Sequence, residues 1–160
     1  MQDAHNGYDI TDFHGALLDI ISVMNQPVRD EQILQAAGVK LEQMLFPLLV
    51  AVGRYGPVGV VELADHLGRD YTTVSRQVKK LEAQGLAGKQ PNRHDRRISE
   101  VTLSARGQQM IDRIAVARRR LMNQVLVQWP EDEVQALFRL TRKYADSLQK
   151  SSPPGAMPGG

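Results

Sequence analysis

The chain has 160 residues, of which 42% are hydrophobic and 24% are charged, and this composition is typical of a soluble protein with a folded core. It contains no cysteine, which excludes disulfides, thiolate metal sites and redox sensing by cysteine. The N-terminus lacks the basic and then apolar pattern of a signal peptide, and no apolar run is long enough to cross a bilayer. We therefore expect a cytoplasmic protein without a membrane partner.

The net charge of +2 hides an uneven distribution of charge along the chain. Residues 1–50 carry two Lys or Arg against seven Asp or Glu, whereas residues 51–106 carry ten against six. This asymmetry indicates a polyanionic partner for the middle of the chain, although an unevenly charged solvated surface would give the same counts.

The N-terminal third of the chain has the apolar spacing of helices. From Asp9 to about Asn25, apolar residues recur every three or four positions and predict one amphipathic helix. Residues 30–37 predict a short helix, and the almost wholly apolar segment 41–54 predicts a central, buried one. Because Pro47 lies inside that segment, the helix either kinks there or begins late.

Residues 61–107 have the order of parts of a winged helix-turn-helix, a module that reads DNA. A short helix over 62–67 ends at Gly68, and Asp70 is placed to cap a second helix that runs to Gln84. One side of the second helix is apolar. The other side would enter the major groove, and its candidate contacts to bases and phosphates are Tyr71, Thr72, Thr73, Ser75, Arg76 and Lys79.

Two short extended runs, 86–90 and 98–103, predict a β-hairpin with a basic tip that carries Arg93, Arg96 and Arg97. A thin cationic loop suits the minor groove, where the concentrated negative potential attracts arginine. A carboxylate beside phosphates should repel them. We therefore expect Asp95 to act indirectly, by holding Arg97 in a fixed pose.

The C-terminal part predicts two more helices. Ser104 is placed to cap a long helix from Ala105 to about Gln128, which at about 1.5 Å per residue is longer than a small winged-helix domain needs. A final helix follows Pro130, and residues 151–160 have the composition of a flexible tail. The four histidines lie in separate elements and no glycine-rich phosphate loop occurs, so we predict no metal site, no cofactor and no enzymatic activity.

These motifs together resemble the MarR (multiple antibiotic resistance regulator) family of transcription regulators, over roughly residues 9–150. The resemblance rests on Glu62-Leu63-Ala64…Leu67-Gly68, on Thr73-Val74-Ser75-Arg76…Leu81-Glu82…Gly85-Leu86, and on the wing signature Asp95-Arg96-Arg97…Leu103-Ser104…Gly107. Three positions depart from the family pattern. Arg69 stands where an apolar residue is usual, Gln77 occupies an inner position of the second helix, and Trp129 replaces the usual Ser or Thr before Pro130. Arg69 and Gln77 either pack together or lie at the edge of the core.

The resemblance implies a mainly α fold with a small β-hairpin wing, in which residues 29–104 form the DNA-binding domain. Residues 1–28 and 105–150 would form a helical dimerisation region built from the N- and C-terminal helices. Two copies would read a pseudo-palindromic operator in double-stranded DNA, most simply as a repressor. The expected dimer contacts are Phe13, Leu17, Leu121, Val125, Trp129, Leu137 and Phe138.

The resemblance also implies a small aromatic or phenolic ligand between the two parts, for which His14 and Arg113 are the candidate contacts. A lone histidine on a helix more often makes an ordinary hydrogen bond than a ligand contact. The competing hypothesis for the whole chain is a winged helix used for protein–protein contacts without specific DNA binding.

Overall fold

The computed structural model describes residues 7–151 and consists of helices with one small sheet. In chain order the elements are α1 (Ile10–Met24), α2 (Pro27–Ala37), the 3-10 helix η1 (Gln43–Leu45), α3 (Phe46–Tyr55), β1 (Val58–Gly59), α4 (Val60–Leu67), α5 (Tyr71–Ala83), β2 (Ala87–Pro91), β3 (Ser99–Leu103), α6 (Ala105–Val125) and α7 (Glu131–Ser151). The predicted mainly α fold with a small β wing is confirmed.

Two boundaries bear on the predictions at the chain ends. Helix α7 extends to Ser151, the first residue of the expected flexible tail, and the remainder of that tail lies outside the described residues. Within residues 7–151, no helix combines the length and the apolar character needed to cross a membrane.

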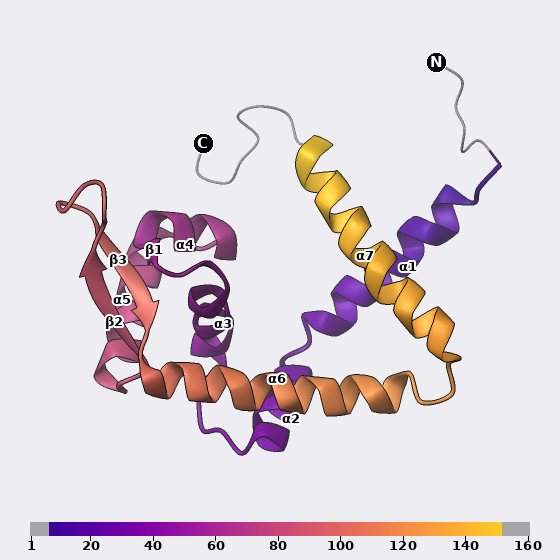
Figure 1. Ribbon diagram of the computed structural model, residues 1–160, viewed down its shortest axis with the longest axis horizontal. Helices are drawn as coiled ribbons and strands as arrows, with labels where there is room; N and C mark the ends of the chain where they lie inside the picture. Colours follow the sequence, from indigo (N-terminus) through magenta and orange to yellow (C-terminus); the bar gives the residue numbers. More distant parts are fainter. Residues whose placement is uncertain (1–6, 152–160) are drawn as a thin grey trace.

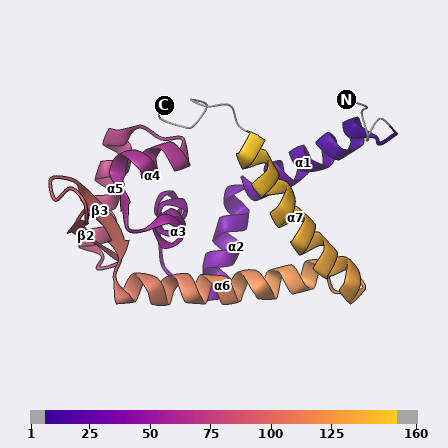
Figure 2. The same ribbon diagram turned by 45° about the horizontal axis from the view of Figure 1, so that its top comes forward.

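The long helix α6 connects two parts of the molecule (Figure 1). Helices α3, α4 and α5 and the sheet gather at its N-terminal end, whereas α1 and α7 cross each other toward its other end, and the turned view shows the same separation (Figure 2). The rings of Phe13 and Tyr144 meet edge to face where α1 and α7 cross, with centroids 5.4 Å apart.

The hydrophobic core lies almost entirely in the first of these parts. Its most deeply buried side chains come from η1, α3, α4, α5, the residue before β2, β3 and α6: Leu45, Leu48, Leu49, Val52, Leu63, Val74, Val78, Leu81, Leu86, Val101 and Ile114. Each such burial contributes about 1.5–3 kcal/mol of transfer free energy. Helices α1 and α7 contain no buried residue, so this core fixes the winged-helix part without their help.

The segment around Pro47 follows the second of the two alternatives predicted for it. A single turn of 3-10 helix comes first, and α3 begins at Phe46, which places Pro47 in its first turn. The N–H that proline lacks would have no partner inside the helix at that position, so the helix does not need to kink.

The sheet has three antiparallel strands in the order β1–β3–β2. The hairpin of β2 and β3 was predicted, and Ala87 to Pro91 pair with Leu103 to Ser99. The two-residue strand β1 was not, because Val58 pairs with Val101, which lies far away in the sequence, and no local pattern marks so short a strand.

Ser104 and Gly107 join the wing to the long helix. The Ser104 hydroxyl donates to the carbonyl of Gly85 at 2.6 Å and accepts from the N–H of Gly107 at 3.0 Å. The Ser104 N–H also donates to the Leu86 carbonyl at 3.0 Å. A side chain at position 107 would collide with that same carbonyl oxygen, so the Leu-Ser-x-x-Gly motif reflects a close approach of two backbones.

We predict that Gly107→Ala lowers the free energy of unfolding by about 1–3 kcal/mol, because the added Cβ would overlap the Leu86 carbonyl oxygen and force the backbones apart. Urea denaturation at one fixed protein concentration measures the effect. Gly88→Ala is the matched control, because a Cβ at that position meets no atom within 4 Å in the described structure. Equal stability of the two variants would contradict the close approach.

Candidate nucleic-acid interface

Asp70 caps the N-terminus of α5, as the sequence predicted. Its Oδ2 accepts from the N–H of Thr73 at 3.0 Å, and its Oδ1 accepts from the Thr73 hydroxyl at 2.7 Å. The hydroxyl donor first, and then the N–H, hold the pKa of the Asp70 carboxyl below its ordinary value. The first turn of α5 is therefore fixed at neutral pH, and the Thr73 hydroxyl proton is already engaged within the protein.

Helix α5 has one buried and one exposed side. Val74, Val78 and Leu81 are inaccessible to solvent and pack the helix against α3, α4 and β2. The predicted DNA contacts lie elsewhere on the helix: Thr72, Arg76 and Lys79 are exposed, Tyr71 is 55% exposed, and Ser75 and Thr73 are half-buried. A helix exposed on its polar and cationic side has the form that a major groove accepts.

The wing holds Asp95 and Arg97 together, which confirms the predicted pairing. The Arg97 Nε and Nη2 atoms each donate to one carboxylate oxygen of Asp95 at 3.0 Å. The backbone N–H of Arg97 also donates to Oδ1 of Asp95, at 3.1 Å. This pairing lowers the pKa of Asp95 and raises that of Arg97. The Arg97 side chain nonetheless stays 90% exposed, so its guanidinium is oriented and still accessible to a partner.

The tip of the wing is shaped by Asn92. Its side-chain oxygen accepts from the N–H groups of His94 and Asp95 at 2.8 and 2.9 Å, and its own N–H donates to the Ile98 carbonyl at 2.7 Å. Arg93 and Arg96 are exposed on the turn that these bonds close. The tip therefore presents its arginines from a loop with defined backbone geometry.

Arg69 and Gln77 pack together, which resolves the alternatives left open for them. The Arg69 Nη1 atom donates to the Gln77 Oε1 atom at 2.9 Å and to the Met44 carbonyl at 3.1 Å. Gln77 is only 5% exposed. The two departures from the family pattern therefore compensate each other, since the arginine supplies a donor to a buried amide oxygen.

A cleft of about 450 Å³ lies where the winged-helix part meets the end of α1, α2 and α6. Three aromatic rings from two elements, α3 and α4, border it. The Arg118 guanidinium carbon lies 5.4 Å from the centroid of the Phe46 ring. The rings of Tyr55 and His66 are parallel, with centroids 3.8 Å apart. The Arg54 guanidinium lies 5.2 Å from the centre of the Tyr55 ring. The cleft thus combines flat apolar walls with two cations.

Asp30 and Arg118 also line this cleft and influence each other. Burial raises the pKa of the Asp30 carboxyl, and the positive charge of Arg118 opposes the rise. Burial lowers the pKa of Arg118, and Asp30 opposes that change. The two groups therefore lie in a partly desolvated place, where a charged ligand would interact more strongly than in open solvent.

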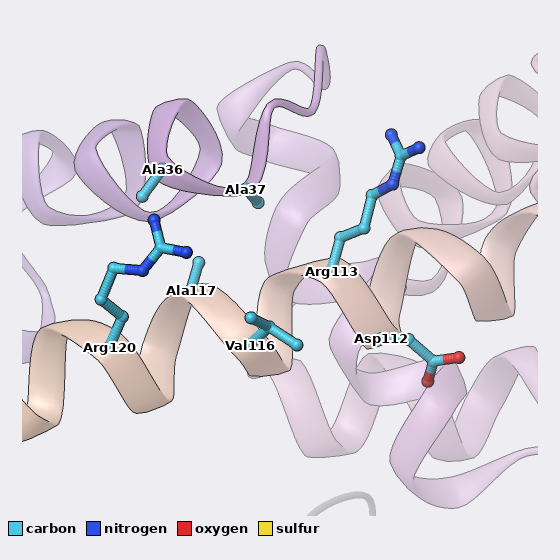
Figure 3. Close-up of a pocket in the computed structure, with 7 residues that line it drawn as sticks. All are labelled: Ala36, Ala37, Asp112, Arg113, Val116, Ala117 and Arg120. Carbon is cyan, nitrogen blue, oxygen red and sulfur yellow. The ribbon is translucent and has the colours of Figure 1, made fainter.

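The two residues predicted to bind a ligand are not brought together. Arg113 borders a separate groove of about 360 Å³ between α2 and α6, where it and Arg120 project from α6 on either side of Ala117 (Figure 3). His14 is exposed on α1 and lines neither this groove nor the larger cleft.

The predicted dimer contacts are largely open to solvent. Leu17 and Leu121 are half-buried, and the exposed fractions of the others are 46% for Phe13, 61% for Val125, 45% for Trp129, 38% for Leu137 and 54% for Phe138. Further apolar side chains on the same helices are also exposed: Ile10, Leu18, Ile20, Ile21, Met24, Leu140 and Leu148. The apolar side chains of α1 and α7 are thus mostly exposed to solvent in a single chain.

Comparison with known proteins shows which family the chain belongs to. Residues 41–98 match the model of the MarR family. The helix-turn-helix-type transcriptional regulator YxaD of Bacillus subtilis (strain 168) is 30% identical over 103 residues, which make up 64% of this chain and 72% of that protein. The chain belongs to the MarR family. It is therefore a transcriptional regulator with a DNA-binding winged helix, and not an enzyme.

Solved structures have the same fold. A MarR family protein from Bacillus stearothermophilus is 21% identical to this regulator, covers 88% of it and 95% of its own chain, and superposes with a TM-score of 0.73. The PcaV transcriptional regulator of Streptomyces coelicolor, solved in complex with its natural ligand, is 20% identical, covers 89% and 98%, and has a TM-score of 0.56.

The sequence did not point to the cleft residues Asp30, Phe46, Tyr55, His66 and Arg118. They come from α2, α3, α4 and α6, and they meet only because these four helices pack together. The sole local signal was the run Arg118-Arg119-Arg120 on a helix with an apolar seam, which does not show which arginine turns toward the core.

We predict that Asp95→Asn lowers the affinity of the regulator for duplex DNA roughly fivefold, because Arg97 loses the charged partner that orients it. Fluorescence anisotropy with a labelled duplex at fixed salt gives the affinity. The direction is informative, since removal of a negative charge would otherwise strengthen DNA binding. The pKa of Asp95 is below its ordinary value, so the pairing persists at neutral pH and is lost only as the pH falls through that lowered pKa.

Asp132→Asn is the matched control for this prediction. It makes the same change in charge at an exposed position in the first turn of α7. Unchanged or tighter binding by Asp95→Asn would show that Asp95 does not orient Arg97 for DNA.

Proposed function

We propose that the regulator is a homodimeric, sequence-specific repressor that acts in the cytoplasm on a pseudo-palindromic operator and is released by a small aromatic or phenolic ligand. Two features together carry the proposal: the exposed, pre-oriented guanidinium of Arg97 and the exposed polar and cationic side of α5. A helix in the major groove and an arginine-bearing loop in the adjacent minor groove would together read one half-site.

Within a half-site, we assign two kinds of contact. Tyr71, Thr72, Ser75 and Arg76 lie in the first turns of α5, where base edges are within reach, and they would set the sequence preference. Lys79 and the wing residues Arg93, Arg96 and Arg97 would mainly bind the phosphate backbone and the minor groove. Thr73 would contribute through the helix cap, because its hydroxyl donates to Asp70.

The apolar surface of α1 and α7 supports the homodimer. Neither helix has a buried residue, although both are amphipathic, and α7 has 21 residues. In a single chain these helices touch each other at Phe13 and Tyr144 and leave most of their apolar side chains in solvent. A second copy with the same surface would bury these side chains, and two-fold symmetry would then present two reading helices to one duplex.

The cleft beside Arg118 supports a ligand of the proposed class. Its volume of about 450 Å³ is within the range of small-molecule sites, and its walls supply flat rings and two arginines. An aromatic acid or phenolate could stack on a ring and pair with Arg118. The ligand-bound structure of PcaV supports small-molecule binding by a relative with the same fold. Arg113 and His14 do not line this cleft, so we place the ligand beside Arg118 instead.

Selection of bound duplexes from a random pool tests the central claim. We expect two inverted half-sites with centres about one helical turn apart, and an affinity that falls steeply with salt because each phosphate contact releases counterions. Phe138→Lys should give a protein of monomeric mass by light scattering and weaken binding to the selected duplex, because Phe138 is 54% exposed in one chain and would be buried in the pair.

Val61→Lys is the control for the mass measurement, since Val61 is an apolar residue on α4 that is 60% exposed, close to the value for Phe138. Its mass should equal that of the wild type. A wild type that enriches no sequence from the pool would favour the competing function, a winged helix used for protein–protein contacts. If the wild type has a monomeric mass and nonetheless binds the selected duplex tightly, the homodimer is refuted.

For the ligand site, we predict that Arg118→Met weakens the binding of benzoate roughly tenfold, because the charge-assisted pairing with the carboxylate is lost. Isothermal titration calorimetry measures the binding, with phenol as a probe that lacks the carboxylate. Arg119→Met removes the same charge from the next residue of α6, which does not line the cleft. If the two variants bind benzoate equally well, the ligand does not pair with Arg118.

A further inference from the structure

The turn between α4 and α5 carries a polar contact that apolar packing alone does not require. Arg69 directly precedes Asp70, the residue that caps α5, and its side chain reaches inward. One nitrogen, Nη1, donates both to the Oε1 atom of Gln77 at 2.9 Å and to the carbonyl of Met44 at 3.1 Å. We call these three groups the Arg69 clamp.

The clamp connects two elements that are fixed in different ways. Met44 belongs to η1, and the next two residues, Leu45 and Phe46, are 0% and 4% exposed, so the core holds this short segment firmly. Gln77 lies in the middle of α5, and it is the one buried polar side chain among the described residues. The Arg69 guanidinium therefore connects the centre of α5 to η1, which the core holds in place.

The two kinds of contact on α5 restrict its motion differently. Contacts of Val74, Val78 and Leu81 are van der Waals contacts, which select the buried side of the helix but tolerate a small rotation or slide. Hydrogen bonds weaken steeply when the angle at the hydrogen bends. The bonds from Arg69 to Gln77 and Met44 therefore restrict rotation and tilt more narrowly than the apolar contacts do.

We propose that Arg69 is a positioning residue for sequence recognition, which sets the rotation and tilt of α5 and thereby the bases that its exposed side chains can reach. The inference rests on the proposed function, because it requires α5 to read base edges. Both N–H groups of Nη1 are directed to acceptors within the protein, which is consistent with action through α5.

The experiment uses the full chain and the duplex that the wild type selects from a random pool, together with every single-base change in one half-site. Arg69→Met, Gln77→Leu and the double variant are compared with wild type by their affinities for this set at two salt concentrations. For Arg69→Met we expect the relative affinities at one or more positions to change roughly tenfold, the size expected for one displaced base contact. Arg119→Met, which loses the same charge on α6, should keep the wild-type profile.

The double variant separates positioning from stability. Arg69→Met leaves the buried oxygen of Gln77 without its donor and should lower the melting temperature. With both polar groups replaced, the melting temperature should recover, while the base preference should stay different from wild type because the directional contact is absent. If Arg69→Met alone is unfolded, the double variant carries the test.

Two results would overturn the inference and leave the proposed function intact. One is a wild-type base profile in the folded variants. The other is an unchanged base profile for Arg69→Met together with a weaker dependence of its DNA affinity on salt, by the amount expected for one lost phosphate contact. That result would mean that Arg69 binds the DNA backbone itself. A wild type that selects no sequence would instead remove the proposed function, and the inference with it.

Discussion

The burial of one side of α5 is the constraint on which the rest of the structure depends. Val74, Val78 and Leu81 are buried against α3, α4 and β2. The polar side of the helix therefore faces the solvent. The cap at Asp70 fixes where the helix starts, and the Arg69 clamp restricts how it is turned. Hydrophobic burial gives the energy, and a few directional bonds give the pose.

The wing solves a different problem, because it has to hold a charged side chain in solvent. Exposed arginines are mobile, and an exposed ion pair normally contributes little to folding. Here the carboxylate of Asp95 receives two side-chain bonds and one backbone bond from Arg97, and Asn92 fixes the turn beneath it. The arrangement orients Arg97 in advance and so lowers the entropy lost on binding, rather than stabilising the fold.

The cleft and helix α5 both contact the segment formed by η1 and the start of α3. Phe46 borders the cleft beneath Arg118, and Met44, two residues earlier, accepts from Arg69. Between them, Leu45 is inaccessible to solvent. A ligand placed against Phe46 would therefore lie beside the segment that anchors α5. The cleft also joins the winged-helix part to the helices that lead away from it, since Asp30 lies on α2, which follows α1, and Arg118 lies on α6, which precedes α7.

The sequence by itself determined the elements whose signals are local. Apolar spacing gave the two sides of α5, Asp70 and Ser104 marked the starts of two helices, and the two-residue separation of Asp95 and Arg97 was enough to predict their pairing. Only the tertiary structure decided the contacts between distant segments. It paired Val58 with Val101, joined Arg69 to Met44, and brought Tyr55, His66 and Arg118 to one cleft while leaving His14 and Arg113 apart. Such contacts depend on how helices pack, and helix periodicity shows which side of a helix is buried but not which partner covers it.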